Sequence, residues 1–488
     1  MPETYLKFQS SPSGRHEGKK HIIIVGAGIM GVCTAYYLVT HPKFDPEKYH
    51  ITIIESKRVA SGASGKAGGL LALWAFPAQI VPLSFDLHQK LSDQYNGVEE
   101  WGYRRLTTVS LEGDLSHLDD EEDDEDEEEE DEASSSNNDG SSQVPSSRKS
   151  KTKLPQDLNW ITSSLISNCS TLGGTDTTAQ VHPYKFTTFI LKKAVELSKG
   201  SIEFIIGKVN RVQFSLETGS ATGVIYQPSS LNKSDYSPES QTLSGDQIVL
   251  TVGPWTSKIL PDCPISGLRA HSITVSPFKD QSVSPYAIFT EFKTGAYSYI
   301  SPEIYARQDE VYVCGEGDSA VDVPETTDDV EVVKSKCDEL FRQVGKISPN
   351  LKRGHILKRQ ACYLPVLDVP SSSGPLIGET NVTNLFLASG HSCWGINNAP
   401  GTGKIMSELL LDGIVESADI SALEPFLYFD ASVLISDDEE DYDDDDDDED
   451  DDNHAGDDEE EEDEDYYRDP TETSSETAPS DAEWSRDA

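Results

Sequence analysis

The sequence lacks the features that would place it in a membrane or in a secreted, disulfide-stabilised class. It contains no run of 18 apolar residues, so we expect no membrane-spanning helix. Residues 1–20 hold no apolar segment of the kind found in secretory signals. The seven cysteines are scattered and include no C-x-x-C pair, which predicts reduced thiols rather than a disulfide or zinc framework. Together these absences predict a cytoplasmic protein.

Positive charge is also scarce. Lys and Arg number 39 against 87 Asp and Glu, giving a formal net charge of −48. Residues 119–132 are 14 consecutive acids and residues 437–465 contain 24 more, so subtracting these 38 charges leaves only −10 for the rest of the chain. Nucleic-acid binding is not expected, because the phosphates would be repelled.

The two acidic runs cannot fold by themselves. Ordering a residue costs about 1–2 kcal/mol, and an all-acid run has no apolar surface to bury against that cost. We therefore expect a disordered leader at 1–19, an acidic disordered insertion at 113–157 and an acidic disordered tail at 436–488. Basic protein partners would suit these arms by charge, although a solvated, solubilising tail is the commoner explanation.

The first structured segment has the pattern of a nucleotide-binding unit. An apolar run at 21–25 predicts a buried strand and leads into the G-x-G-x-x-G sequence of residues 26–31. A helical pattern then runs to about Thr40, and a second strand at 51–54 ends in Glu55. In such a unit the glycines form the tight turn and admit a pyrophosphate, while the acid accepts hydrogen bonds from a ribose. The alternative is a helix start that binds no nucleotide.

The loop after this acid favours FAD over NAD. Residues 58–69 are rich in Gly, Ser and Ala, where an NAD-binding domain would normally enter its next helix. Hydroxyls and bare backbone N–H groups in such a loop suit a second phosphate and a flat ring. The alternative is a flexible connector.

This stretch resembles the FAD-dependent D-amino-acid-oxidase family, which includes glycine, sarcosine and pipecolate oxidases and many uncharacterised fungal oxidoreductases. Four later blocks resemble the same family: a helix after 180–184, a strand at 202–209, a strand at 248–252 followed by Gly-Pro-Trp, and a glycine-rich strand–loop–helix at 374–404. The helix of the last block is expected to start near Gly401. The resemblance implies FAD as the cofactor, and it implies that these residues bind it: Gly26, Ala27, Gly28, Ile29, Met30, Gly31, Glu55, Ser56, Ser61, Ser64, Gly65, Ala67, Gly68, Gly69, Val209, Gly253, Trp255, Gly390, His391, Trp394, Gly395, Gly401 and Thr402.

The fold class implied is α/β, with a Rossmann-like FAD-binding domain of non-contiguous segments and a mixed-sheet substrate domain of α+β type. We place the FAD-binding parts at 20–112, 158–268 (with a substrate-domain segment) and 361–430, and the substrate domain at 269–360. Alternation and aromatic residues predict strands of the substrate sheet at 273–275, 287–290, 297–300 and 311–314.

The sequence contains few candidates for residues that contact the substrate. His391 is the best one, and a histidine hydrogen-bonded into its own loop is the alternative. Tyr299 and Arg269 would suit a carboxylate, but a core Tyr and an exposed Arg are the favoured interpretations. Cys362 lies where sarcosine-type relatives attach the flavin covalently, with a buried apolar Cys as the alternative. Those relatives have a Lys where this chain has Trp394.

The function implied is oxidation of a C–N bond in a small-molecule amine, imino acid or amino acid by hydride transfer to the flavin, with no metal involved. The alternative is an FAD-binding regulatory or interaction protein with little turnover, associated peripherally with endosomes and acting in endosome-to-Golgi trafficking, as predicted for some fungal relatives.

Overall fold

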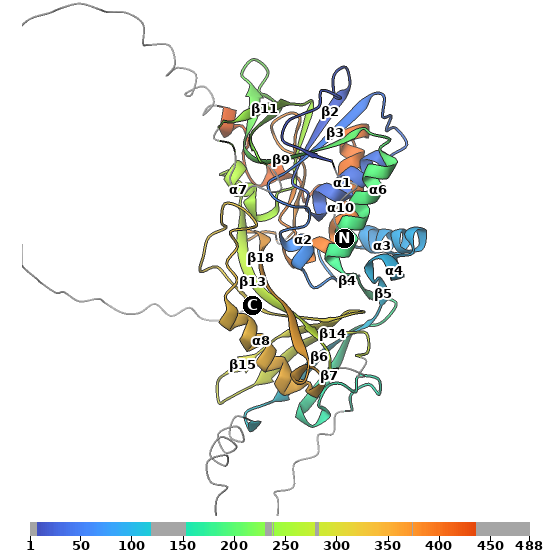
Figure 1. The fold of residues 1–488 in the computed structure, drawn as a ribbon, viewed down its shortest axis with the longest axis vertical. Helices are drawn as coiled ribbons and strands as arrows, with labels where there is room; N and C mark the ends of the chain where they lie inside the picture. The colour runs from blue at the N-terminus through green and yellow to red at the C-terminus, as the bar shows by residue number, and fades with distance from the viewer. Residues whose placement is uncertain are drawn as a thin grey trace, which may run out of the picture. The chain divides into compact units, whose positions relative to one another are not determined.

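The apolar runs of the sequence form the middle of a large sheet in the computed structural model, which describes residues 7–118, 153–229, 237, 239–278, 283–372 and 374–435 (Figure 1). Both acidic runs, with the disorder expected there, lie outside the described residues. The first sheet has the strand order β11-β10-β9-β3-β2-β12-β20-β19, with β1 beside β9. Its strands are β1 Phe8–Gln9, β2 Lys20–Val25, β3 Tyr49–Glu55, β9 Ile202–Ser215, β10 Ser220–Pro228, β11 Gln241–Ser244, β12 Gln247–Leu250, β19 Leu376–Glu379 and β20 Leu385–Ser389.

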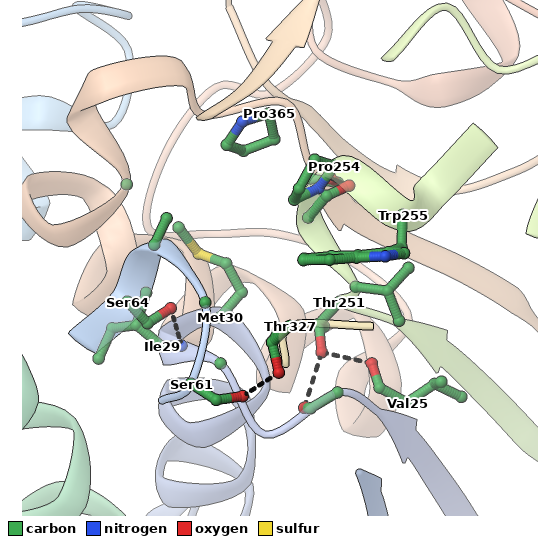
Figure 2. A pocket seen from close by; sticks show the side chains of 18 of the residues that line it. Val25, Ile29, Met30, Ser61, Ser64, Thr251, Pro254, Trp255, Thr327 and Pro365 are labelled. Atoms are coloured by element: carbon green, nitrogen blue, oxygen red, sulfur yellow. Dashed lines mark hydrogen bonds between the residues drawn. The ribbon is translucent and has the colours of Figure 1, made fainter. Parts of the chain in front are cut away.

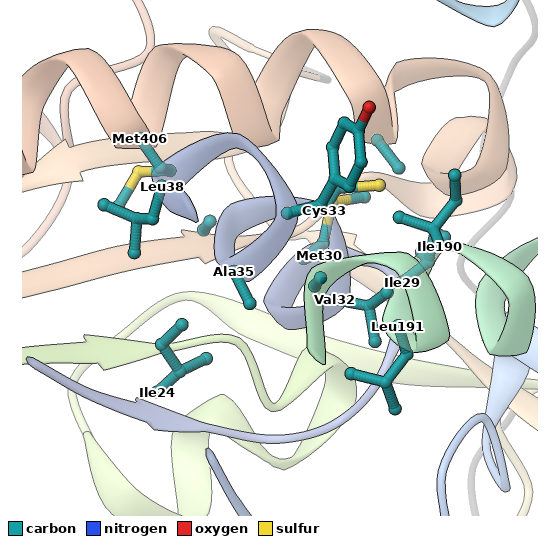
Figure 3. Close-up of a cluster of buried hydrophobic side chains, with 14 of the residues drawn as sticks. Ile24, Ile29, Met30, Val32, Cys33, Ala35, Leu38, Ile190, Leu191 and Met406 are labelled. Carbon is teal, nitrogen blue, oxygen red and sulfur yellow. The ribbon is translucent and has the colours of Figure 1, made fainter. Parts of the chain in front are cut away.

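The central strands are parallel and buried on both faces. Ile22 and Ile24 of β2 face the helices, whereas Ile23 and Val25 face the β10–β11 side. The helices of this part are α1 Ile29–Thr40, α3 Val81–Tyr95, α4 Gly97–Trp101, α6 Pro183–Leu197, α7 Thr256–Ile259 and α10 Gly395–Asp412. Figure 3 shows the core between the sheet and α1, α6 and α10, where Ile190, Leu191 and Met406 surround α1.

A second sheet has the order β18-β13-β17-β16-β14-β6-β7, with β15 beside β14. Its strands are β6 Thr107–Asp114, β7 Ile166–Gly173, β13 Ile265–Ser276, β14 Tyr286–Lys293, β15 Tyr299–Ile300, β16 Glu303–Ala306, β17 Val311–Asp318 and β18 His355–Leu367. Helices α8 Lys334–Ile347 and α9 Pro349–Lys352 cover one face. All four strands predicted for a substrate sheet lie in this sheet, which also contains β6, β7, β16 and β18, four strands that were not predicted for it.

The remaining elements are short. A three-stranded sheet consists of β4 Leu70–Ala72, β8 Thr178–Gln180 and β5 Arg104–Arg105. Helix α2 is a single turn, Ala63–Lys66. The 3-10 turns are η1 Ser163–Leu165, η2 Gly253–Trp255, η3 Ser392–Trp394 and η4 Pro425–Leu427. The fold is therefore mixed α/β, as the sequence predicted.

Several predicted boundaries were wrong. Residues 7–19 are ordered against the first sheet, because β1 pairs with β9 and Ser13 donates to the buried carboxylate of Glu203 at 2.7 Å. Strand β6 belongs to the second sheet rather than to the first FAD-binding segment, and β13 and β18 extend into the same sheet beyond the boundaries expected at 269 and 360. The margins of the expected insertion are also structured, since Leu115 is buried and Asp157 accepts a hydrogen bond from Tyr286 at 2.7 Å.

Helix α10 begins at Gly395, six residues before the expected start at Gly401. Pro400 lies inside the helix and cannot donate to the carbonyl oxygen of Ile396. The ring of His88 in α3 supplies a replacement hydrogen bond to that oxygen at 2.9 Å. Ser84, also in α3, donates to the carbonyl oxygen of Asn397 at 2.7 Å and accepts from the N–H of Gly401 at 2.9 Å. Contacts from α3 therefore allow the helix to pass through Pro400.

Candidate functional site

The first glycine turn is fixed by close contacts between β2, β12 and α1. Gly26 has φ +101°, and a Cβ there would lie 2.8 Å from the carbonyl oxygen of Thr251. A Cβ on Gly31 would lie 2.1 Å from the carbonyl oxygen of Gly26, so α1 approaches the turn as closely as a glycine allows. The Thr251 hydroxyl donates to the carbonyl oxygens of Val25 and Gly26, at 2.7 and 3.1 Å. Both glycines are thus required by packing.

The N terminus of α1 opens onto a pocket. Its N-cap is Gly28, which has no side chain to cap the helix. Ser64 of α2 does this instead, accepting the N–H of Ile29 at 2.9 Å, and a Cβ on Gly28 would stand 3.1 Å from the Ser64 oxygen (Figure 2). Gly28, Ile29 and Met30 all line the pocket. A helix N terminus with its positive dipole end directed at such a space suits a phosphate.

Glu55 braces this turn from the end of β3. Its Oε2 accepts the N–H of Ala27 at 2.8 Å, and its Oε1 accepts the N–H of Lys57 at 2.9 Å. Burial raises the pKa of Glu55, while these backbone N–H groups act in the opposite direction. The carboxylate also lines the pocket, so an oxygen with further acceptor capacity faces the space where the ribose is expected.

The second glycine-rich turn reaches the same pocket from the other end of the sequence. Gly390 has φ +81° directly after β20, and His391, Cys393 and Gly395 line the pocket. His391 is 3% exposed, its Nε2 is hydrogen-bonded to the Thr402 hydroxyl at 3.0 Å, and burial lowers its pKa to about 3. The ring is therefore neutral and is hydrogen-bonded to α10. This contact fits the alternative given in the sequence analysis, in which the histidine shapes its own loop.

The structure gathers fourteen of the expected cofactor residues around this one pocket. They are Gly26, Gly28, Ile29, Met30, Glu55, Ser56, Ser61, Ser64, Ala67, Val209, Gly253, Trp255, His391 and Gly395. Nine other expected residues are not among the lining residues: Ala27, Gly31, Gly65, Gly68, Gly69, Gly390, Trp394, Gly401 and Thr402. Gly401 lies inside α10, where a Cβ would lie 2.9 Å from Cβ of Ser84.

Other lining residues were missed by sequence reasoning. Glu325 and Thr327 come from the segment after β17, and Leu364 and Pro365 come from β18. The Thr327 hydroxyl is hydrogen-bonded to Ser61 at 2.8 Å (Figure 2). No local motif marks these residues, because only the packing of the second sheet against the first brings them to the pocket.

One group of lining residues that was missed carries charge. Glu325 forms ion pairs with Lys208 and with Lys258, the latter at 2.6 Å, and all three residues line the pocket. In addition, the Trp255 indole donates to the carbonyl oxygen of Pro324 at 2.6 Å. The segment that carries Pro324 and Glu325 is therefore held at the pocket by both lysines and by Trp255.

Three remaining candidates lie elsewhere. Cys362 is buried in β18 and does not line the pocket; burial raises its pKa to about 11. Arg269 is 4% exposed and is paired with Asp318 and Glu331, so it is not the exposed Arg that was expected. Tyr299 is 57% exposed rather than in the core. Within the described ranges, no group of His, Cys, Asp and Glu could hold a metal ion, and no helix is long and apolar enough to cross a membrane.

Three features meet at one pocket: a strand–glycine-turn–helix unit, an acid at the end of the next strand, and a second glycine turn. Together they define a dinucleotide-binding α/β protein. The family model for FAD-dependent oxidoreductases of the DAO type matches residues 21–409, and the chain belongs to this family. Its cofactor is FAD, and it is an oxidoreductase of the amino-acid oxidase and dehydrogenase type.

Two fungal relatives match almost over their full length. "Putative oxidoreductase TDA3" of Saccharomyces cerevisiae is 49% identical, with 88% of this chain and 98% of that protein aligned. "Putative oxidoreductase C1F5.03c" of Schizosaccharomyces pombe is 36% identical over 83% of this chain and 98% of its own length. Among solved structures, iminodiacetate oxidase from Chelativorans is 16% identical, with a TM-score of 0.58 over 83% of this chain and 98% of its own. Glycine oxidase from Bacillus cereus is 17% identical, with a TM-score of 0.56 over 82% and 96%. These two structures share the fold.

Proposed function

We propose that this chain oxidises the C–N bond of a small amine, imino acid or amino acid. The observation that carries the proposal is the convergence of the two glycine turns on one pocket that also borders the second sheet. The two solved relatives described above are by name oxidases of iminodiacetate and of glycine, and both compounds are amino acids or their derivatives. When bound, FAD supplies the acceptor for a hydride from the carbon beside nitrogen.

We further propose that the fourteen pocket residues hold this cofactor. The N terminus of α1 would take the pyrophosphate, and Glu55 a ribose. The start of α10 at Gly395 places a positive helix end at the pocket, where it would stabilise negative charge on a reduced ring. His391 adds no charge there, because its pKa of about 3 keeps it neutral. The protein's own part is thus to bind, orient and exclude water.

The test is the visible spectrum of the purified full-length protein, followed by anaerobic mixing with sarcosine, proline, pipecolate, a series of D- and L-amino acids, and carboxylate-free amines such as benzylamine and spermidine. The proposal predicts yellow protein that at least one of these compounds bleaches. Yellow protein that no amine or amino acid reduces would contradict it and favour the regulatory alternative. A cytoplasmic location and basic partners of the acidic arms remain predictions.

A further inference from the structure

One face of the second sheet carries a carboxylate among aromatic rings. In the strand register, Ala287 pairs with Tyr305 and Glu303 pairs with Cys314. Because side chains alternate along each strand, Phe289, Glu303 and Tyr305 project from the same face. The neighbouring Ile288 and Ile304 project from the other face, into the core beneath α8. Glu303 therefore faces away from that core, toward the FAD-binding part.

Rings from both parts of the molecule meet on this face. We define the aromatic cluster as Trp74, Phe76, Phe289, Tyr305 and Trp394. The ring centroid of Trp74 lies 5.4 Å from that of Trp394 and 6.3 Å from that of Phe289, and Phe289 lies 6.1 Å from Tyr305. Phe76 is 6.1 Å from Trp394. Trp74 and Phe76 are 41% and 38% exposed, so the cluster is open to a ligand on that side.

Among the described residues, the carboxylate on this face has no counter-ion. Glu303 accepts a hydrogen bond from the Tyr305 hydroxyl and lies 3.7 Å from Sγ of Cys314. It forms no ion pair with any residue that the structure describes. Burial raises the pKa of Glu303, as expected for a carboxyl held beside aromatic rings without a cation. A positively charged ligand would supply the charge partner that this carboxylate lacks.

The aromatic cluster borders the cofactor pocket at two points. Trp394 lies in the chain between Cys393 and Gly395, both of which line the pocket. Ala67 also lines it, and a Cβ on the next residue, Gly68, would lie 2.2 Å from the Tyr305 ring. Burial and then the negative charge of Glu303 raise the pKa of the Cys393 thiol, in keeping with the closeness of this carboxylate to the pocket wall.

Two cations beside the pocket wall, Arg307 and Lys66, already have acceptors within the protein. Arg307, 5% exposed, pairs with Glu310 at 2.7 Å and donates to the carbonyl oxygens of Ala67 and Gly68. Lys66 donates to the carbonyl oxygen of Ala361 at 3.0 Å. A carboxylate is normally recognised by an Arg, which can form two parallel hydrogen bonds to it, or by the ammonium group of a Lys. This face instead offers a carboxylate and π-faces, which attract ammonium groups.

We propose that the substrate is a cationic amine without a carboxylate, whose ammonium group is held by Glu303 and the aromatic cluster. Before the neighbouring C–H bond can give up a hydride, the ammonium must lose a proton, and the Glu303 carboxylate would accept it. The proposal rests on the oxidation of a C–N bond proposed above and narrows its substrate class.

The test measures binding rather than turnover. The full-length, FAD-loaded protein is titrated with tetramethylammonium, benzyltrimethylammonium and benzoate by isothermal calorimetry, with Trp fluorescence and the flavin spectrum followed in parallel. Neither cation has a nitrogen lone pair, so neither can be oxidised as an amine. We expect at least one cation to bind at least ten-fold more tightly than benzoate, with a change in Trp fluorescence. Benzoate binding as tightly as both cations would overturn the proposal.

Variants locate the binding. Glu303→Gln should weaken cation binding about ten-fold or more, and Trp74→Leu several-fold. Glu217→Gln removes an exposed carboxylate in the β9–β10 turn and should change nothing. An unchanged Kd in Glu303→Gln, with flavin content and melting temperature like those of the parent, would also overturn the proposal. If the cations bind but no amine bleaches the flavin, only the oxidase function is refuted. If amino acids bleach the flavin and benzoate competes with them, only the assignment to cationic amines is refuted.

Discussion

Replacing Gly31 by alanine tests whether the close approach of α1 to the first glycine turn is needed for FAD binding. The added Cβ would lie 2.1 Å from the carbonyl oxygen of Gly26 and 2.7 Å from Oγ1 of Thr251. Ordinary contact begins near 3.4 Å, so the helix must move by about 1.3 Å. Overpacking of this kind costs about 1–3 kcal/mol, which exceeds the roughly 1 kcal/mol that alanine gains over glycine in a helix. We expect net destabilisation.

A matched control comes from α8. A Cβ on Gly345 would meet nothing closer than 3.5 Å, so Gly345→Ala should stabilise the protein by up to about 1 kcal/mol. The assays are flavin content after gel filtration, FAD affinity by flavin fluorescence and melting temperature. Gly31→Ala should lower all three, because the displaced helix carries the N–H groups of the expected phosphate site. Full flavin content and an unchanged melting temperature in Gly31→Ala would refute this reasoning.

Three further predictions concern single side chains. Ser64→Ala removes the cap of α1 and should cost about 0.5–2 kcal/mol while weakening FAD binding, and a melting temperature equal to that of the parent would contradict the capping role. Burial lowers the pKa of His88 to about 4 and that of His391 to about 3. As the pH falls below about 6.5, these histidines are therefore protonated in the unfolded chain before they are protonated in the folded protein. The free energy of unfolding should consequently decrease from about pH 6.5 toward pH 4. Chemical denaturation across pH 4–8 measures this, and a His88→Asn variant should show a shallower decline. Acid precipitation should release all flavin into the supernatant, because Cys362 is buried and its pKa is raised to about 11, so the reactive thiolate is scarce. Flavin that stays in the pellet of the parent protein but not in that of Cys362→Ala would show a covalent link.

The glycines show how far a motif can be interpreted before the structure is known. Gly26, Gly28 and Gly31 form the strand-to-helix turn that their spacing predicted, because a turn with this spacing fixes its own backbone geometry. Gly401 was expected to lie at the start of a helix. Instead it lies inside α10, as does Gly403, where a Cβ would be 2.5 Å from the backbone of Cys33 in α1. Their purpose is close packing between helices, which a local pattern does not distinguish from a turn.

The boundaries between the two sheets illustrate the same limit. Strands β6, β13 and β18 have the apolar alternation expected of either sheet, and their assignment depends on hydrogen bonds to partners far away in the chain. In the same way, no sequence pattern around Glu203 indicates that this buried acid binds Ser13 and holds residues 7–19 against the first sheet.

The sequence by itself determined the nucleotide-binding turn, the acid that comes after it, the cofactor class and four strands of the second sheet. Each of these depends on short-range periodicity or on a turn that closes within about 35 residues. Only the tertiary structure decided which side chains from the second part of the chain come to the pocket and its border: Glu325 lies between its two lysines at the pocket, and Glu303 lies beside the aromatic cluster that borders it. Such contacts depend on how the two sheets pack together and not on any local sequence preference.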